Sequence, residues 1–130
     1  MLREEDADIL GVCETHLDSI GNSRVVVAGY QWFGNGCSES QCGVGFLVKR
    51  GMKCKIIKNK HVKDEGRCIL IEIEGKLIME AYAPVECASA PKRDSFFDDM
   101  AEEIAAISVM DRSLIIVGDW NAHIEGFFIY

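Results

Sequence analysis

The feature that most constrains this sequence is the stretch 114–123, which reads LIIVGDWNAH. Four consecutive apolar residues run into a glycine, and Asp119, Asn121 and His123 follow closely. A short continuous apolar run predicts a strand that is buried on both faces. Ligand sites in α/β proteins commonly lie beyond the carboxyl ends of such strands. The stretch therefore predicts a strand that delivers Asp119 and Asn121 to the rim of a site.

Two other apolar runs end in the same way: residues 9–13 lead into Glu14, and residues 76–81 lead into Tyr82. Mg²⁺ takes oxygen ligands from one or two carboxylates and from substrate phosphate. Glu14 is therefore a candidate metal ligand, and Asp119 a candidate ligand or general base. The amide of Asn121 could orient a phosphate oxygen. Buried strands also commonly end in polar residues, so the pattern alone leaves ordinary strand-end polarity open.

The composition indicates a globular chain of one domain or less. Its 130 residues are enough for a core. No apolar run approaches the roughly 20 residues that span a membrane. The N-terminus is acidic and lacks an apolar signal core, so we expect an intracellular protein, nuclear or cytoplasmic, that is not secreted. The net charge of −7 disfavours unaided nucleic-acid binding and suits a site that collects a divalent cation, although a plain acidic surface explains it too.

The six cysteines do not form the spacing of a metal site. Cys13, Cys54 and Cys68 lie within apolar runs, where a free cysteine behaves as a small hydrophobic residue. The absence of any C-x-x-C pair argues against zinc. Cys37 and Cys42 flank a loop and could pair, but we expect reduced cysteines in a reducing compartment.

Periodicity predicts a mixed α/β chain. We expect strands over 7–13, 25–33, 43–48, 52–57, 67–73, 76–82 and 114–117, polar loops over 18–24 and 34–41, and the end of a helix over 1–6. Glu74-Gly75 predicts a hairpin turn between neighbouring antiparallel strands. Glu72, Glu74 and Glu80 predict a partly solvated face on these strands.

Residues 91–108 change to a helical period. Phe97, Met100, Ile104 and Ile107 recur at spacings of three or four, with Phe96 alongside. Acidic residues fall between them, which predicts an amphipathic helix with acids in its early turns, where they favour the helix dipole.

Three further features have weaker signals. Arg67 precedes a strand and could face an anionic substrate, although a solvated charge is the commoner outcome. His16 and His123 follow the two polar motifs and are more typical of surface or supporting residues than of ligands. Gly43-Val44-Gly45 lacks the third glycine and the following helix of a phosphate loop, so strand packing explains it better.

The order of these motifs resembles the endonuclease/exonuclease/phosphatase superfamily, and the resemblance covers nearly the whole chain. The overall residue pattern is most similar to the endonuclease domains of non-LTR retrotransposons, including host proteins similar to craniofacial development protein 2. Five motifs carry it in order along the chain: DILGVCET at 8–15, GVGFLV at 43–48, Gly66-Arg67, Tyr82-Ala83-Pro84, and GDWNAH at 118–123.

The resemblance implies a partial four-layer α/β/β/α sandwich with mainly antiparallel and mixed sheets. It also implies phosphodiester hydrolysis of DNA that depends on Mg²⁺ or Mn²⁺. By that resemblance Glu14 binds the metal, Tyr82 hydrogen-bonds the scissile phosphate, and Asp119 positions or deprotonates the attacking water. Asn121 contacts the phosphate. Arg67 and His123 are supporting residues.

Some family motifs have no match in this chain. The family pattern begins with a strand that carries an Asn, and it ends with a further Asp and a Ser-Asp-His segment. We therefore expect residues 1–130 to form a single domain of this type that is truncated at both ends. Such a fragment would be weakly active or inactive and prone to self-associate through exposed sheet edges. Two alternatives remain open: a phosphatase acting on a small phosphorylated substrate, and a non-catalytic scaffold or interaction module.

Overall fold

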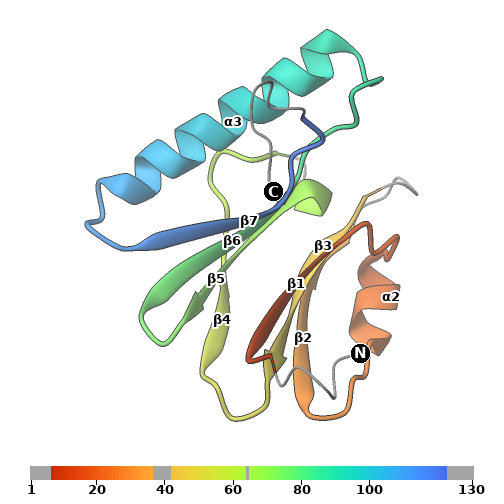
Figure 1. Ribbon diagram of the computed structural model, residues 1–130, viewed down its shortest axis with the longest axis vertical. Helices are drawn as coiled ribbons and strands as arrows, with labels where there is room; N and C mark the ends of the chain where they lie inside the picture. The colour runs from red at the N-terminus through yellow and green to blue at the C-terminus, as the bar shows by residue number, and fades with distance from the viewer. Residues whose placement is uncertain (1–6, 37–41, 64, 123–130) are drawn as a thin grey trace, which may run out of the picture.

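The computed structural model describes residues 7–36, 42–63 and 65–122, which form two β-sheets packed face to face with a helix outside each (Figure 1). The long helix α3 (Ala90–Ser108) lies along the outer face of the larger sheet. The short helix α2 (Ser19–Arg24) lies against the smaller one. This confirms the predicted α/β/β/α arrangement of layers.

The smaller sheet has three antiparallel strands in the order β1-β3-β2. Strand β1 spans Ile9–Cys13, β2 spans Tyr30–Asn35, and β3 spans Val44–Lys49. The central strand β3 is almost wholly buried, as its apolar sequence requires. The position of β1 at the edge of the sheet brings its carboxyl end, and hence Glu14, close to the second sheet (Figure 1).

The larger sheet has four strands in the order β4-β5-β6-β7. Strands β4 (Cys54–Ile57), β5 (Cys68–Ile73) and β6 (Lys76–Tyr82) are antiparallel, and β5 follows a short 3-10 helix, η1 (Glu65–Arg67). The predicted hairpin is confirmed, because Glu74 (φ 48°) and Gly75 (φ 81°) both adopt the left-handed conformation that tight hairpin turns need. Strand β7 (Leu114–Asp119) runs parallel to β6, and α3 supplies the crossover that a parallel pair requires.

Alternating residues of β5 and β6 divide the core into two layers. Leu70, Leu77 and Met79 pack towards α3, together with Phe96 and Met100 of that helix. Between the sheets lies a second cluster: Val44, Phe46, Val48, Ile69, Ile71, Ile73 and Tyr82. Period-two alternation therefore places Tyr82 in the space between the sheets.

Two predicted boundaries near the N-terminus are wrong. Residues 18–24 were expected to be a loop, but 19–24 form α2, because the Asp18 carboxylate caps the helix by accepting a hydrogen bond from the Gly21 N–H at 2.6 Å. The strand predicted over 25–33 begins only at Tyr30, and Val26 is exposed in the connection that precedes it. The helix predicted over 1–6 lies outside the described residues.

The long helix is confirmed over Ala90–Ser108, but its details differ from the prediction. Its first turn holds no acidic residue, so the expected favourable dipole interaction there is absent. The face towards the sheet carries Phe96 rather than Phe97, which is 42% exposed. Glu103 is buried on this face, where its Oε2 accepts hydrogen bonds from the backbone N–H groups of Lys60 and His61 at 2.9 and 2.7 Å. These bonds replace the water that the carboxylate loses.

Three further expectations fail. Strand β7 is not buried on both faces, since Ile115 and Val117 are 48% and 38% exposed. Glu80 is not solvated but 3% exposed, because it points between the sheets. Cys42 forms a disulfide, whose partner lies outside the described residues, whereas Cys13, Cys54, Cys68 and Cys87 are free. No helix in the described part of the chain is long and apolar enough to cross a membrane.

Candidate active site

A hydrogen bond between the two sheets forms the centre of the candidate site. The Tyr82 hydroxyl, at the end of β6, donates to Oε1 of Glu14, just beyond β1, at 2.5 Å. Burial raises the pKa of the Tyr82 hydroxyl to about 12, and the neighbouring carboxylate of Glu14 contributes to this shift. Tyr82 therefore stays a proton donor at any pH at which the protein would work.

Glu14 adopts an unusual backbone conformation. Its φ of 53° lies in the left-handed region, which costs a residue with a Cβ about 1 kcal/mol or more. The next residues are held in place by backbone hydrogen bonds to the start of β3, from Thr15 N–H to the Gly43 carbonyl and from His16 N–H to the Cys42 carbonyl. These bonds fix the turn that presents the exposed Glu14 carboxylate at the mouth of the space between the sheets.

Asp119 lies beside Tyr82 because β6 and β7 are parallel. The register pairs Tyr82 with Asp119, and the Ala83 N–H donates to the Asp119 backbone carbonyl at 2.8 Å. Parallel pairing brings the carboxyl ends of both strands to one edge of the sheet, so Asp119 lies at a rim as the sequence predicted, next to Tyr82. The Asp119 carboxylate is at the exposed end of β7.

Asn121 is fixed by two hydrogen bonds. Its backbone N–H donates to Oδ1 of Asp119 at 2.9 Å, and its side-chain Nδ2 donates to the Ala83 carbonyl at 2.8 Å. The first bond holds the Asp119 carboxylate, whose Oδ2 then remains the oxygen that could accept a proton from water. The amide nitrogen of Asn121 carries two hydrogens, so one remains for a phosphate oxygen.

An open hollow of about 510 Å³ lies over the end of β7, lined by Glu86, Asp119, Trp120 and Asn121. Its lining combines carboxylate and amide groups with an indole ring, which offers a flat apolar surface. Sequence reasoning missed Glu86 and Trp120, although Trp120 stands between the two polar residues that it did single out. The hollow is thus large enough for part of a substrate next to the polar groups.

Arg67 contacts both the backbone and the ring of Tyr82. Its Nη1 donates to the Tyr82 carbonyl at 3.3 Å, and its guanidinium carbon lies 5.2 Å from the centre of the tyrosine ring. At 8% exposure Arg67 is buried, so the commoner outcome of a solvated charge is wrong here. Both contacts hold the Tyr82 backbone and ring in place, which is compatible with the supporting role predicted for Arg67.

A second buried acid lies close to this site. Glu80 is two residues before Tyr82 on the same face of β6, and the Cys13 thiol donates to its Oε1 at 2.8 Å. Burial raises the pKa of the Glu80 carboxyl, and burial also raises the pKa of Cys13 to about 12. Sequence reasoning placed Glu80 in solvent. Its spacing of two from Tyr82 was the signal that could have placed it between the sheets.

The donor set suits a hard divalent cation. Glu14 and Asp119 supply carboxylate oxygens and Asn121 an amide, which are the ligand types of Mg²⁺. The described residues contain no cluster of three or more His, Cys, Asp and Glu side chains, so a zinc-type cage is absent from them. Mg²⁺ commonly uses one or two carboxylates together with water and substrate phosphate, and two exposed carboxylates fit that requirement.

The structure therefore brings together four of the residues singled out from the sequence, Glu14, Tyr82, Asp119 and Asn121, with Arg67 behind Tyr82. His123 lies outside the described residues, and His16 is exposed. The fold and this edge-of-sheet site define a class of α/β/β/α sandwich proteins. The sequence matches the endonuclease/exonuclease/phosphatase family over residues 1–127, and the chain belongs to this family.

Solved structures agree with this fold. A 3'-5' exonuclease from Neisseria meningitidis matches with a TM-score of 0.73 and 19% identity, covering 92% of this chain and 50% of that protein. An AP endonuclease from Archaeoglobus fulgidus matches with a TM-score of 0.69 and 21% identity, covering 91% of this chain and 48% of that protein. The chain thus spans about half the length of both proteins. A comparison with curated proteins finds no significant match.

Proposed function

We propose that this chain carries part of the site of a divalent-metal-dependent phosphodiesterase that acts on DNA. One observation carries the proposal: the Tyr82 hydroxyl bonds the exposed Glu14 carboxylate at 2.5 Å while Asp119 lies next to Tyr82 in register. A permanently protonated hydroxyl, a candidate metal ligand and a candidate base at one edge suit attack of water on a phosphodiester.

Each residue has a distinct role in this proposal. A bound Mg²⁺ or Mn²⁺, held by Glu14, would offset negative charge on the scissile phosphate. When Glu14 holds the metal, the Tyr82 hydroxyl would turn its single hydrogen from Glu14 to a phosphate oxygen, and the amide of Asn121 donates to another. Asp119 accepts a proton from the attacking water through Oδ2, because Oδ1 already accepts the N–H of Asn121. As the new P–O bond forms, the bond from phosphorus to the leaving DNA oxygen breaks, and solvent water protonates that oxygen. Arg67 keeps Tyr82 in place through its carbonyl.

DNA is the proposed substrate because the motif order resembles retrotransposon endonuclease domains, and the two similar solved structures are an exonuclease and an AP endonuclease. The chain-wide charge of −7 does not assist binding of a polyanion. We expect the 130-residue chain to be a slow enzyme, since no described residue matches the family's Ser-Asp-His segment, whose histidine would stabilise the developing charge.

The test combines metal binding with catalysis. Mg²⁺ or Mn²⁺ binding is measured by calorimetry for the wild type and for Glu14→Gln, and nicking of supercoiled plasmid is measured for the wild type and for Asp119→Asn. We expect Glu14→Gln to weaken metal binding at least about tenfold. Asp119→Asn should lower slow, metal-dependent nicking by about 10²-fold or more, because the base is lost. Lys76→Gln, a surface substitution at the opposite end of β6, is the matched control.

Three outcomes would overturn the proposal. Metal binding that is unchanged in Glu14→Gln would refute the role of Glu14 as a metal ligand. Nicking that persists unchanged in Asp119→Asn would refute the role of Asp119 as the base. Hydrolysis of a small phosphomonoester without any attack on DNA would favour the phosphatase alternative instead.

A further inference from the structure

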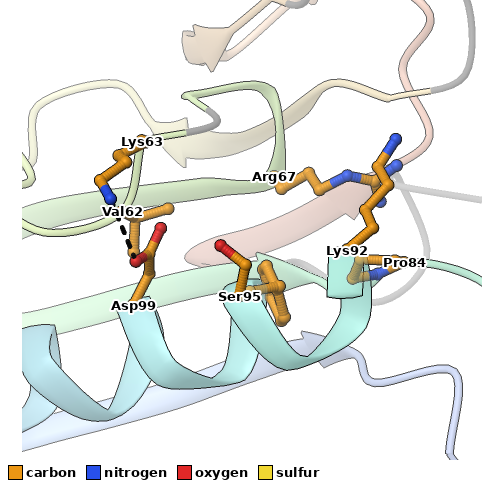
Figure 2. Close-up of a pocket in the computed structure, with 8 residues that line it drawn as sticks. Val62, Lys63, Arg67, Pro84, Lys92, Ser95 and Asp99 are labelled. Atoms are coloured by element: carbon orange, nitrogen blue, oxygen red, sulfur yellow. Dashed lines mark ion pairs between the residues drawn. The ribbon is translucent and has the colours of Figure 1, made fainter. Parts of the chain in front are cut away.

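A basic pocket of about 160 Å³ lies next to the candidate active site, on the α3 side of the larger sheet (Figure 2). It opens between the first turns of α3 and the connection that leads into η1. Its lining includes Lys63, Arg67, Lys92, Ser95, Phe96 and Asp99. Pro84, two residues beyond Tyr82, also borders it, so the pocket adjoins the segment that follows Tyr82.

The charge of this pocket is opposite to that of the chain. The whole sequence has 21 acidic against 14 basic residues, whereas the described residues that line the pocket include three basic side chains and one acidic one. The acidic side chain, Asp99, faces Lys63 at 3.9 Å, which is a long ion pair. Figure 2 shows Lys92 extending from α3 towards the buried guanidinium of Arg67. A local excess of positive charge on an acidic protein favours an anionic ligand.

The walls of the pocket strengthen that preference. Val62 and Phe96 are 6% and 5% exposed, so apolar side chains back the charged groups and lower the local dielectric response. The 19-residue helix α3 begins at Ala90, and Lys92 and Ser95 stand in its first two turns. The positive end of its dipole therefore adds to the charge of the three side chains.

Arg67 connects this pocket with the candidate active site. The same side chain lines the pocket, donates to the Tyr82 carbonyl at 3.3 Å and lies over the Tyr82 ring. A ligand in the pocket is thus close to, but separate from, a phosphate held by the Tyr82 hydroxyl. We propose that the basic pocket binds a nucleic-acid backbone phosphate that flanks the scissile one, with Lys92 and Lys63 as its exposed ligands. This inference rests on the proposed function.

Binding of a fluorescein-labelled DNA oligonucleotide by the 130-residue chain, measured by fluorescence anisotropy across a salt series, tests the pocket. We expect Lys92→Gln to weaken binding roughly fivefold at low salt and to reduce the slope of log K against log salt by about 1. Lys63→Gln should act in the same direction. The charge-matched control is Lys76→Gln, which removes the same charge at the far hairpin and should leave both quantities unchanged.

A second set of measurements distinguishes DNA phosphate from free phosphate as the ligand. It also separates the pocket proposal from the proposed catalytic function. Inorganic phosphate at millimolar concentration should compete with DNA for the wild type but less for Lys92→Gln. Metal-dependent hydrolysis of bis(p-nitrophenyl) phosphate, which has no flanking phosphate, should fall less in Lys92→Gln than nicking of DNA does. A pocket effect without hydrolysis in any variant would support the pocket while the proposed catalytic function fails.

Two results would overturn the assignment of the pocket even if hydrolysis is observed. The first is an equal affinity and salt slope for Lys92→Gln and Lys76→Gln. The second is binding of inorganic phosphate at the pocket without displacement of DNA. The pocket would then be a site for a free anion and not for a phosphate of the DNA backbone. Thermal unfolding of each variant establishes that the folded chain is being compared.

Discussion

At the scale of single residues, the state of the Tyr82 hydroxyl determines how activity should depend on pH. Its pKa is raised to about 12, chiefly by burial, so it stays protonated across the working range. We expect Tyr82→Phe to lower metal-dependent hydrolysis by about 10²-fold, as loss of one donor to a developing oxyanion commonly does. The shape of the pH–rate profile below pH 11 should be unchanged, because no ionisation of Tyr82 falls there. Rates of both proteins between pH 6 and pH 10 check this, and a basic limb that disappears in Tyr82→Phe would contradict it.

Glu80 yields a prediction about stability. Burial raises the pKa of its carboxyl, and its Oε2 has no hydrogen-bond partner among the described residues. The folded state then binds more protons than the unfolded state between the ordinary pKa of 4.5 and the raised one, so stability falls as pH rises through that window. We expect Glu80→Gln, which cannot ionise, to be more stable than the wild type above the window and nearly equal to it below pH 4.

The control for Glu80 is a surface acid on the neighbouring strand. Hydrogen bonding to Arg112 and Lys55 lowers the pKa of Glu72, so its contribution is present above the ordinary pKa and lost as pH falls. Glu72→Gln should therefore lose stability at neutral pH, the opposite sign. Urea unfolding of both variants at pH 4 and pH 7.5 gives the comparison. A Glu80→Gln variant that loses stability at pH 7.5, as Glu72→Gln does, would refute the assignment for Glu80.

The candidate site could be predicted from the sequence because its residues end strands. Tyr82 and Asp119 end two parallel strands of one sheet and so meet at its edge, whereas Glu14 reaches them from the other sheet through the packing of the two sheets. Glu80 was misplaced because a polar residue in a strand normally indicates a solvated face, and only the packing of the second sheet reverses that expectation. The disulfide of Cys42 was not expected, because residue spacing does not define which cysteines pair.

At the scale of elements, Gly118 in β7 allows β7 to approach β6 closely. Its φ is 142°, and a Cβ added there would lie 1.8 Å from the Ala81 carbonyl oxygen. Gly118→Ala should therefore destabilise the fold by about 3 kcal/mol through backbone strain and displacement of β6. Gly29→Ala, where φ is also positive but nothing lies within 4 Å, should cost only about 1 kcal/mol. Denaturant unfolding measures both, and equal losses would show that the close approach to Ala81 does not matter.

The elements that sequence reasoning placed correctly have strong local signals. Helix α3 has a long apolar period, and the β5–β6 hairpin has both strong strands and a turn residue that accepts positive φ. Helix α2 lacked such signals, since it contains Gly21 and Asn22 and depends on one capping carboxylate, Asp18. The continuous apolar run of β7 predicts a strand that is buried on both faces. In the structure only the face with Leu114 and Ile116 packs against the core cluster that includes α3.

At the scale of the whole molecule, β7 leaves apolar surface uncovered. Ile115 and Val117 are 48% and 38% exposed on the face of the sheet that also carries Ile78, and β7 is the outer strand of its sheet in the described part of the chain. An outer strand with an apolar face tends to pair with another chain. We expect the 130-residue chain to self-associate at tens of micromolar, and Ile115→Lys to weaken that association about tenfold, because a charge would be buried in the contact.

The control must separate this strand from exposed apolar residues in general. Val26 is 83% exposed in the connection before β2 and belongs to no strand, so Val26→Lys should leave association unchanged. Sedimentation velocity over a concentration series gives the dissociation constant of each variant. Since Ile115 contributes little to either core, Ile115→Lys should unfold at nearly the wild-type temperature. A wild-type chain that stays monomeric across the series would refute the prediction, and an equal loss in both variants would indicate general stickiness rather than pairing along β7.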